Sequence, residues 1–509
     1  MSSTPSPIDP NACYLAMKAR DARFDGRFFT GVTSTGIYCR PVCGVRTPRR
    51  ENCRFFAHAA LAERAGFRPC LRCRPELAPG TPWWSIQDAS AILAQQAARL
   101  MDDPDTWLAD DASVQRLAAR IGISDRHLRR IFEAQFGVTP IQYLQTRRLL
   151  AAKQLLADTD LPVHQVAIAS GFSSLRRFND AFVAHYRLNP TQLRRAGAPP
   201  AADGVTVRLG YRPPLDSAAM GRFFQQRQIA GVERVEMDPA GDGFTLARTV
   251  RLASGASRHC GWLVARLQPS RCQVGLRVDD ALRPVLPQLI RRVRQLFDLD
   301  ADPAAIEPLL QADFPQAEGQ RVPGTLDGFE LAVRAVLGQQ VTVAAARTLA
   351  HRLVQAYGSP VTTPIATLER LFPDAAALAA ADPDRLGAIG IVRQRQRAIQ
   401  ALARAVADGT LVLGASSDVP STLAQLTALP GIGDWTAHYI AMRALRWPDA
   451  FPAGDVALHN ALGVRGAPHP ARAAEARSQA WRPWRSYAVV RAWNSLPAAV
   501  AAATPPEGE

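Results

Sequence analysis

Four cysteines near the amino terminus constrain the fold of this chain more than any other feature. Cys39 and Cys43 form one close pair, Cys70 and Cys73 form a second, and the 26 residues 44–69 separate the pairs. Two such pairs can supply the four thiolates of a tetrahedral metal site, so we predict a Zn²⁺ site here. Many glycines and prolines interrupt the surrounding segment. It can bury little apolar surface, and a bound metal would supply the missing stability.

Length and charge indicate several domains and a polyanionic partner. The chain has 509 residues and a formal net charge of +15, which favours nucleic acid over other partners. A basic surface that is only solvated is the alternative. Residues 1–10 lack the features of a secretory signal, and no apolar run is long enough to span a membrane. We therefore expect a cytoplasmic protein without membrane contact, whose reduced thiols bind metal rather than form disulfides.

The cysteine segment resembles a known family. The run FDGRFFTGVTSTGIYCRPVCGVRTPRRENCRFF, followed by AGFRPCLRCRP, is similar to the amino-terminal domain of the Ada response proteins over residues 1–82. The resemblance implies that Cys39 takes a methyl group irreversibly from a methylated DNA phosphate, while Cys43, Cys70 and Cys73 complete the zinc coordination. Zinc keeps sulfur as the nucleophilic thiolate. Methylation removes one negative charge, which strengthens DNA binding and makes the site a sensor. A purely structural zinc site is the alternative, and Cys53 is expected to be an ordinary buried thiol.

Two similar helical units are predicted within residues 83–197. A helix over 83–101 and an acidic linker over 102–111 precede them, and each unit has a turn at a glycine, Gly122 or Gly171. Each unit is predicted to be a helix-turn-helix, and together they resemble the DNA-binding domain of AraC-type activators, which implies promoter DNA and RNA polymerase as partners. An unrelated helical pair could explain one such unit, but it explains two units in tandem, each with an arginine-rich second helix, far less well. The residues predicted to face base edges are Arg126, His127, Arg129, Arg130, Ser173, Ser174, Arg176 and Arg177.

A linker rich in proline, glycine and alanine, residues 196–204, leads to a region that is predicted to be α+β. The segment VTVRLGYRPPLD and short β-rich runs at 243–252, 261–267 and 272–276 resemble the amino-terminal domain of AlkA-type 3-methyladenine DNA glycosylases, over residues 205–320. A simple packing domain is the alternative, and we assign no chemistry to it.

Residues 321–500 are predicted to be all-α with a helix-hairpin-helix. In LPGIGDWTAHYIAMRAL, Gly431 and Gly433 form a tight turn whose N–H groups can bind a phosphate. The segment FPAGDVALHNAL follows, and together these motifs resemble the helix-hairpin-helix glycosylases of the AlkA branch. The resemblance implies that Asp455 is catalytic, because a carboxylate stabilises positive charge on the sugar and orients water. The target base must be flipped out of the duplex.

The same resemblance implies an aromatic pocket and a monofunctional enzyme. Trp435, Tyr439 and Trp493 match pocket positions where aromatic faces suit a cationic base, although each of them could equally be a core residue. Trp435 also stands where lyase-active relatives carry an amine, which argues against a Schiff-base mechanism. Gln340 replaces a leucine that one AlkA inserts into DNA, so we expect it to fill the gap as a polar wedge. No P-C-H-R motif for a second methyl acceptor is present.

The sequence therefore predicts a multidomain protein that combines a zinc methyl sensor, a tandem helix-turn-helix activator and a DNA glycosylase. The four predicted folds are a small zinc-bound α+β domain, an all-α domain, a second α+β domain and an all-α glycosylase domain. A non-enzymatic regulator that senses methylation through Cys39 is the first alternative. A glycosylase whose amino-terminal half only adds DNA affinity is the second.

Overall fold

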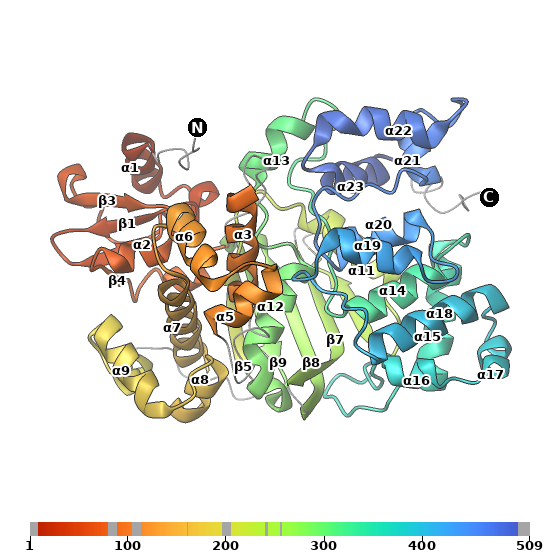
Figure 1. Cartoon of the computed structure of the whole chain (residues 1–509), viewed down its shortest axis with the longest axis horizontal. Coiled ribbons are helices and arrows are strands. Elements are labelled where there is room, and N and C mark those ends of the chain that lie inside the picture. The colour runs from red at the N-terminus through yellow and green to blue at the C-terminus, as the bar shows by residue number, and fades with distance from the viewer. Residues whose placement is uncertain are drawn as a thin grey trace.

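The structure is a computed structural model that describes residues 9–79, 89–103, 113–159, 161–195, 205–239, 243–254 and 257–496. Along the chain a small mixed domain, a group of helices, a β-sheet with its own helices and a large helical region follow one another (Figure 1). The linkers predicted at 102–111 and 196–204 lie wholly or largely outside the described residues. Among the described residues, no helix has both the length and the apolar character that crossing a membrane requires.

The first domain is built on a four-stranded sheet. Strand β1 (Phe29–Val32) pairs antiparallel with β2 (Ile37–Cys39) and with β3 (Cys53–Phe56), and β4 (Arg68–Pro69) runs parallel to β2. Helix α1 (Pro10–Ala19) precedes the sheet, and α2 (Ala59–Arg64) links β3 to β4. Gly36, with φ of 65°, permits the tight turn between β1 and β2. This pairing brings the end of β2 beside the end of β4, where two cysteines lie.

The second domain contains the two predicted helix-turn-helix units joined by one long helix. Gly122 and Gly171 both have φ of 78° and form the two turns. The predicted helix over 83–101 begins at Ala89 in the described residues, because 80–88 lie outside them. The helices are α3 (Ala89–Asp102), α5 (Val114–Ile121), α6 (Asp125–Phe136), α7 (Pro140–Asp158), α8 (Val163–Ala169), α9 (Leu175–Tyr186) and α10 (Pro190–Arg195).

The third domain is a five-stranded antiparallel sheet with the order β5-β9-β8-β7-β6. Apolar side chains alternate along β5, so that one face of the sheet packs against α12. The three β-rich runs predicted from the sequence correspond to β7, β8 and β9. The elements are β5 (Val205–Gly210), α11 (Ser217–Arg227), β6 (Glu233–Met237), β7 (Phe244–Ser254), β8 (Ser257–Gln268), β9 (Gln273–Val278), α12 (Leu286–Leu296) and α13 (Pro303–Leu310).

In the fourth region, the regular elements among the described residues are all helices, as predicted. Two hydrophobic cores fill it, one around α14 and α18 and one around α23. Ile306 and Leu310 of α13 belong to the second core, although they precede residue 320. The helices are α14 (Gly328–Leu337), α15 (Val343–Tyr357), α16 (Ala375–Ala379), α17 (Pro383–Ala388), α18 (Arg393–Ala407), α19 (Val419–Thr427), α20 (Asp434–Arg443), α21 (Val456–Ala461), α22 (Pro470–Ser478) and α23 (Arg485–Ser495).

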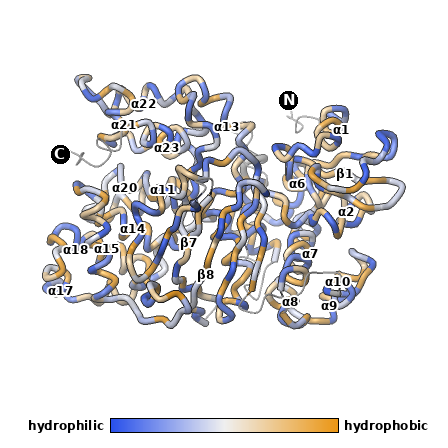
Figure 2. Tube along the Cα trace, turned by 180° about the vertical axis from the view of Figure 1, so that it is seen from behind, coloured by the Kyte–Doolittle hydropathy of each residue, from blue (hydrophilic) through white to orange (hydrophobic). Residues whose placement is uncertain are grey.

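The domains pack directly against one another. Hydrophobic residues occur in all four parts of the chain (Figure 2), and one continuous core joins α7, α8 and α9 to the sheet of the third domain. Lys153 of α7 ion-pairs with Glu76 of the zinc domain at 2.5 Å and donates to the carbonyl of Cys70 at 3.1 Å. Arg212, which is fully buried, donates to the carbonyls of Asp25, Pro79, Asp300 and Ala301. The zinc domain is therefore docked on both of its neighbours.

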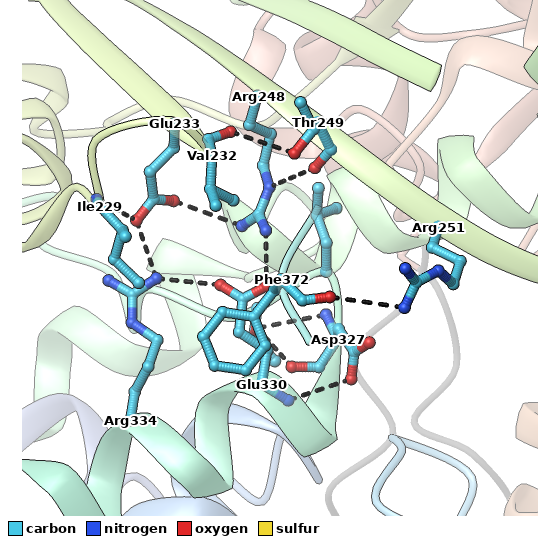
Figure 3. Close-up of polar contacts among 12 residues, drawn as sticks. Ile229, Val232, Glu233, Arg248, Thr249, Arg251, Asp327, Glu330, Arg334 and Phe372 are labelled. Carbon is cyan, nitrogen blue, oxygen red and sulfur yellow. Dashed lines mark hydrogen bonds and ion pairs between the residues drawn. The ribbon is translucent and has the colours of Figure 1, made fainter. Parts of the chain in front are cut away.

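A buried ion-pair network joins the sheet domain to the helical region (Figure 3). Arg248 of β7 lies between Glu233 of β6 at 3.3 Å and Glu330 of α14 at 2.7 Å. Arg334, one turn further along α14, contacts the same two carboxylates at 2.8 and 3.0 Å. Thr249 adds a 2.6 Å hydrogen bond to the carbonyl of Arg370. These contacts fix the orientation of α14 on the sheet.

Candidate functional site

The four predicted cysteines converge at the edge of the first sheet. Their sulfur atoms all lie within 4.8 Å of one another, and Cys39, Cys43 and Cys70 are buried while Cys73 is half-buried. Strands β2 and β4 position Cys39 and Cys70, and a turn in which the Cys43 N–H donates to the Arg40 carbonyl at 3.1 Å brings in the second cysteine. Each is a free thiol. Four converging soft sulfur ligands without a disulfide suit Zn²⁺.

The four sulfur atoms are not equivalent in their hydrogen bonds. The N–H of Arg40 donates to the sulfur of Cys73 at 3.4 Å, and backbone N–H groups of Val45 and Cys73 approach Cys43 and Cys70. Within the described ranges, no backbone N–H donor to the sulfur of Cys39 is found. An N–H donor withdraws charge from a thiolate and makes it a weaker nucleophile. Hydrogen bonding with the neighbouring thiols, with burial, raises the pKa of Cys39, so a stable thiolate there requires a cation beside it.

The helix-turn-helix units expose the start of their second helices. Arg126, Arg129 and Arg130 at the start of α6 are exposed, and His127 is half-buried beside Arg130 at 3.0 Å. Ser173, Ser174, Arg176 and Arg177 are exposed at the start of α9. The hydroxyls of Ser124 and Ser174 cap the two helices. Each accepts the backbone N–H of the residue three positions further along the chain, at 3.2 Å in both helices. The two units therefore present similar basic ends.

In the helical region, Asp455 lies at the start of α21 and accepts three hydrogen bonds. One oxygen accepts the N–H of Leu458 at 2.6 Å and the indole N–H of Trp493 at 3.2 Å. The other oxygen accepts the indole N–H of Trp435 at 2.7 Å. Asp455 is 7% exposed. Three N–H donors fix the orientation of this carboxylate, and among the described residues no cationic side chain pairs with it.

The structure brings the three predicted pocket aromatics to this carboxylate. Trp435 and Tyr439, one turn apart on α20, stack with ring centres 5.4 Å apart and an interplanar angle of 13°. Trp493 of α23 lies 6.2 Å from Tyr439. All three are half-buried, so their faces are not enclosed as core aromatics would be. Sequence reasoning missed the bonds of the two indoles to Asp455, since the three residues lie on separate helices.

The helix-hairpin-helix is formed by α19 and α20. Gly431, with φ of 75°, and Gly433, which precedes α20, are both exposed at the turn. The side chain of Gln339 donates to the carbonyl of Gly431 and to the hydroxyl of Thr436, both at 2.9 Å. Gln340 follows it, exposed and with φ of 53°, at the tip of the connection between α14 and α15. Sequence reasoning noted Gln340 and missed Gln339, which holds this tip against the hairpin.

Family profiles match four consecutive parts of the chain. The profile "Metal binding domain of Ada" matches residues 12–76, and "Helix-turn-helix domain" matches 117–196. The profile "AlkA N-terminal domain" matches 206–327, and "HhH-GPD superfamily base excision DNA repair protein" matches 333–486. With the four-cysteine cluster and the Asp455 carboxylate held by two indoles, these matches define a DNA glycosylase that is joined to a zinc-binding, DNA-binding regulator.

Curated relatives identify the family more narrowly. A Mycobacterium tuberculosis protein named "Probable bifunctional transcriptional activator/DNA repair enzyme AlkA" is 41% identical over 96% of this chain and 97% of its own length. The chain therefore belongs to the family of these bifunctional activator and repair enzymes. DNA-3-methyladenine glycosylase 2 of Escherichia coli is 34% identical over 56% of this chain and 95% of its own length. The E. coli activator and repair enzyme Ada is 37% identical over 28% of this chain and 38% of its own length.

Proposed function

We propose that this protein responds to DNA alkylation in two ways: Cys39 accepts a methyl group from a DNA methylphosphotriester, and the Asp455 pocket excises alkylated purines such as 3-methyladenine. The observation that carries the excision is the Asp455 carboxylate, fixed by Trp435, Trp493 and Leu458 beside stacked aromatic rings. The convergence of four sulfur atoms, with Cys39 alone lacking an N–H donor among the described residues, supports the transfer.

In the proposed transfer, the thiolate of Cys39 attacks the methyl carbon of the phosphotriester. A sulfur–carbon bond forms as the carbon–oxygen bond breaks, and the phosphodiester leaves with the electron pair. Bound Zn²⁺ would supply the positive charge that keeps the sulfur of Cys39 ionised. Cys43, Cys70 and Cys73 would hold the metal ion. The product thioether does not return to a thiolate, so each molecule reacts once. The site loses one negative charge, and repulsion of DNA phosphates falls.

In the proposed excision, the bond between the sugar and the alkylated base breaks and its electron pair leaves with the base. An alkylated base that already carries a positive charge leaves as a neutral molecule, so no acid is required. Asp455 stabilises the positive charge that develops on the sugar and orients the attacking water. The donors described around Asp455 are indole and amide N–H groups. None of them is an amine nucleophile, which supports a monofunctional hydrolase without lyase activity.

The regulatory role rests on the two helix-turn-helix units. Methylation of Cys39 would increase affinity for promoter DNA, and the activator would then recruit RNA polymerase. We assign these roles to residues 1–82 and 83–197, and base excision to 205–320 and 321–500. The exposed arginines of α6 and α9 would contact base edges, while Gly431, Gly433 and Gln340 would hold and wedge the damaged duplex. A chromosomal substrate supports a cytoplasmic location.

Replacing Cys39 with alanine is expected to abolish methyl transfer. Incubation with DNA that carries radiolabelled methylphosphotriesters should leave about one label per wild-type molecule and none on Cys39→Ala, because the nucleophile is missing. Cys53→Ala is the matched control, since Cys53 is a buried thiol in the same sheet but outside the cluster. Label retained by Cys39→Ala would mean that another residue accepts the methyl group, and absence of label from wild type would leave the amino-terminal half with a role in DNA binding only.

Removing one indole donor from Asp455 is expected to reduce excision without abolishing it. Trp493→Phe keeps an aromatic ring but loses the 3.2 Å bond to Asp455. We expect a roughly tenfold lower single-turnover rate, because a hydrogen bond to a charged group is worth about 1.5–3 kcal/mol. Trp447→Phe is the control, because Trp447 makes no bond to Asp455 in the described contacts. A Trp493→Phe rate equal to that of wild type would contradict the positioning role.

A further inference from the structure

Two arginine side chains lie behind the pocket residue Tyr439. Arg443, one turn further along α20, places a guanidinium nitrogen 2.5 Å from the phenol oxygen. Its other donors are used by the carbonyls of Pro323 at 2.8 Å and Gly324 at 3.0 Å. Arg227, the last residue of α11, comes from the sheet domain and adds a second positive charge near Tyr439. Two domains thus place positive charge beside one phenol.

Both guanidinium groups lie against the ring of Phe223, which is on α11 of the sheet domain. Arg227 lies 3.9 Å from the centre of the Phe223 ring, and Arg443 lies 4.7 Å from it. Arg443 is 7% exposed and Arg227 is half-buried. An aromatic face and backbone carbonyls compensate a buried cation only in part, so a full counter-charge is still needed nearby.

Neither arginine has a carboxylate partner in the described part of the chain. Their neighbour Arg334 contrasts with them, because Glu233 and Glu330 both contact it (Figure 3), while its other nitrogen donates to the carbonyl of Arg227. An isolated buried cation is costly, and proteins normally pair it. Among the described side chains that Arg443 and Arg227 contact, Tyr439 is the one that can carry a negative charge.

We propose that Arg443 and Arg227 polarise and ionise Tyr439, so that its ring becomes a negatively charged wall that selects cationic alkylated bases over neutral bases of the same shape. The inference rests on the proposed excision and names two residues that would set the preference of that site for charged bases. Arg443 and Arg227 are then positioning residues that act through Tyr439. Arg227 also gives the sheet domain a part in specificity.

The stack carries this preference to the reacting centre. Tyr439 lies parallel to Trp435, and Trp435 donates to Asp455. A cationic base that contacts this stack interacts with two electron-rich rings and lies near the carboxylate. A neutral isostere would fill the same volume without the charge interaction. Shape would therefore admit both bases, and charge would distinguish them.

The charged groups around Tyr439 set the direction of its pH dependence. They are Arg443 on its own helix, Arg227 on α11, Arg334 on α14 and, beyond Trp435, Asp455 at α21. Burial raises the pKa of Tyr439, but Arg443 and Arg227 outweigh burial and hold it below its ordinary value. The phenolate is therefore populated as pH rises through this lowered pKa. Selectivity for cationic bases should increase with pH and fall as pH drops through the same range.

The functional test uses two matched duplexes. One carries 7-methylguanine, which is cationic, and the other carries 7-deaza-7-methylguanine, a neutral isostere that is not cleaved and serves as a competitive inhibitor. The measured quantity is the inhibition constant of the duplex with the neutral isostere, divided by the KM of the duplex with 7-methylguanine. We expect this ratio to fall roughly tenfold in Tyr439→Phe and in Arg443→Gln. Arg443→Gln should have no further effect on the ratio in a Tyr439→Phe background. Equal ratios in wild type and Tyr439→Phe at every pH would overturn the proposal.

A spectroscopic test avoids dependence on activity and on the folding of Arg443→Gln. The ultraviolet absorbance of tyrosinate is followed during a pH titration of wild type and Tyr439→Phe. We expect wild type to show one extra tyrosinate that appears below the pH at which free tyrosine ionises, and Arg443→Lys to move it by less than Arg443→Gln. Identical titrations of wild type and Tyr439→Phe in that range would reject ionisation of Tyr439. If excision is absent but the extra tyrosinate is present, the proposed function fails and the anionic wall remains.

Discussion

Replacing Asp455 with asparagine is expected to slow the release of 3-methyladenine from methylated DNA by about two to three orders of magnitude, the range seen when one electrostatic group is removed from a transition state. Asparagine keeps an oxygen that can accept the N–H of Leu458, now 2.6 Å from the carboxylate, so the cap of α21 survives. It lacks the negative charge that stabilises the sugar. Single-turnover release of the free base from a methylated duplex measures the effect.

Asp418→Asn is the matched control for this substitution. Asp418 caps α19 by accepting the N–H of Ser421 at 3.0 Å, so the same chemical change is made at the start of another helix of the hairpin. It should release base at the wild-type rate. Equal rates for wild type and Asp455→Asn would refute the catalytic role. Absence of release from wild type would favour the alternative of a regulator that binds DNA without cleaving it.

Replacing Glu330 with alanine is expected to lower the free energy of unfolding by about 3–5 kcal/mol, which is the usual cost of removing one partner from a buried ion pair. Glu330 is 3% exposed and contacts Arg248 at 2.7 Å and Arg334 at 3.0 Å. Without it, Glu233 alone would face both cations. Urea unfolding followed by tryptophan fluorescence would report the change in the helical region.

An exposed pair at the same interface supplies the control. Arg258 contacts Asp374 at 3.1 Å, but its side chain is 64% exposed. Arg258→Ala should change the free energy of unfolding by less than about 1 kcal/mol. A loss of similar size in the two variants would mean that burial of the Glu330 network is not what makes it important.

The Glu330 network also predicts a direction of acid sensitivity. Burial raises the pKa of Glu330, but Arg248 and Arg334 outweigh burial and hold it below its ordinary value. A carboxyl with a depressed folded pKa contributes stability above its unfolded pKa and loses this contribution as pH falls through the folded value. The difference in stability between wild type and Glu330→Ala should therefore shrink in acid. A difference that does not change with pH would contradict this ionic role.

Much of the candidate sites could be predicted because their chemistry depends on short local patterns. The spacing of Cys39 and Cys43, and of Cys70 and Cys73, predicted the sulfur cluster. Helical spacing also places Trp435 and Tyr439 on one face of α20. The contact of Trp493 with Asp455 could not be derived from spacing, because the two residues lie 38 positions apart along the chain.

The buried arginines were outside the reach of sequence reasoning. In a sequence, an arginine indicates a solvated surface, and the excess of positive charge here indicated a nucleic acid partner. In the structure, Arg212, Arg248 and Arg443 are buried, and each has at least one partner that lies far away along the chain. Arg212 reaches Asp25 across 187 positions and Arg248 reaches Glu330 across 82. Their positions follow from tertiary packing, as does the placement of Arg227 near Tyr439 of another domain.

The docking of the zinc domain changes how the two chemical sites meet DNA. Arg212 and Lys153 bind the zinc domain to the sheet domain and to α7, so this domain is not connected to the others by a flexible linker alone. A flexible tether would give the second site an effective concentration that depends on linker length. A docked domain instead holds the second site at a fixed distance and in a fixed direction from the first site. One bound duplex can then engage both sites only if its curvature matches that geometry, which makes the bending of DNA a variable in the coupling of damage sensing to base repair.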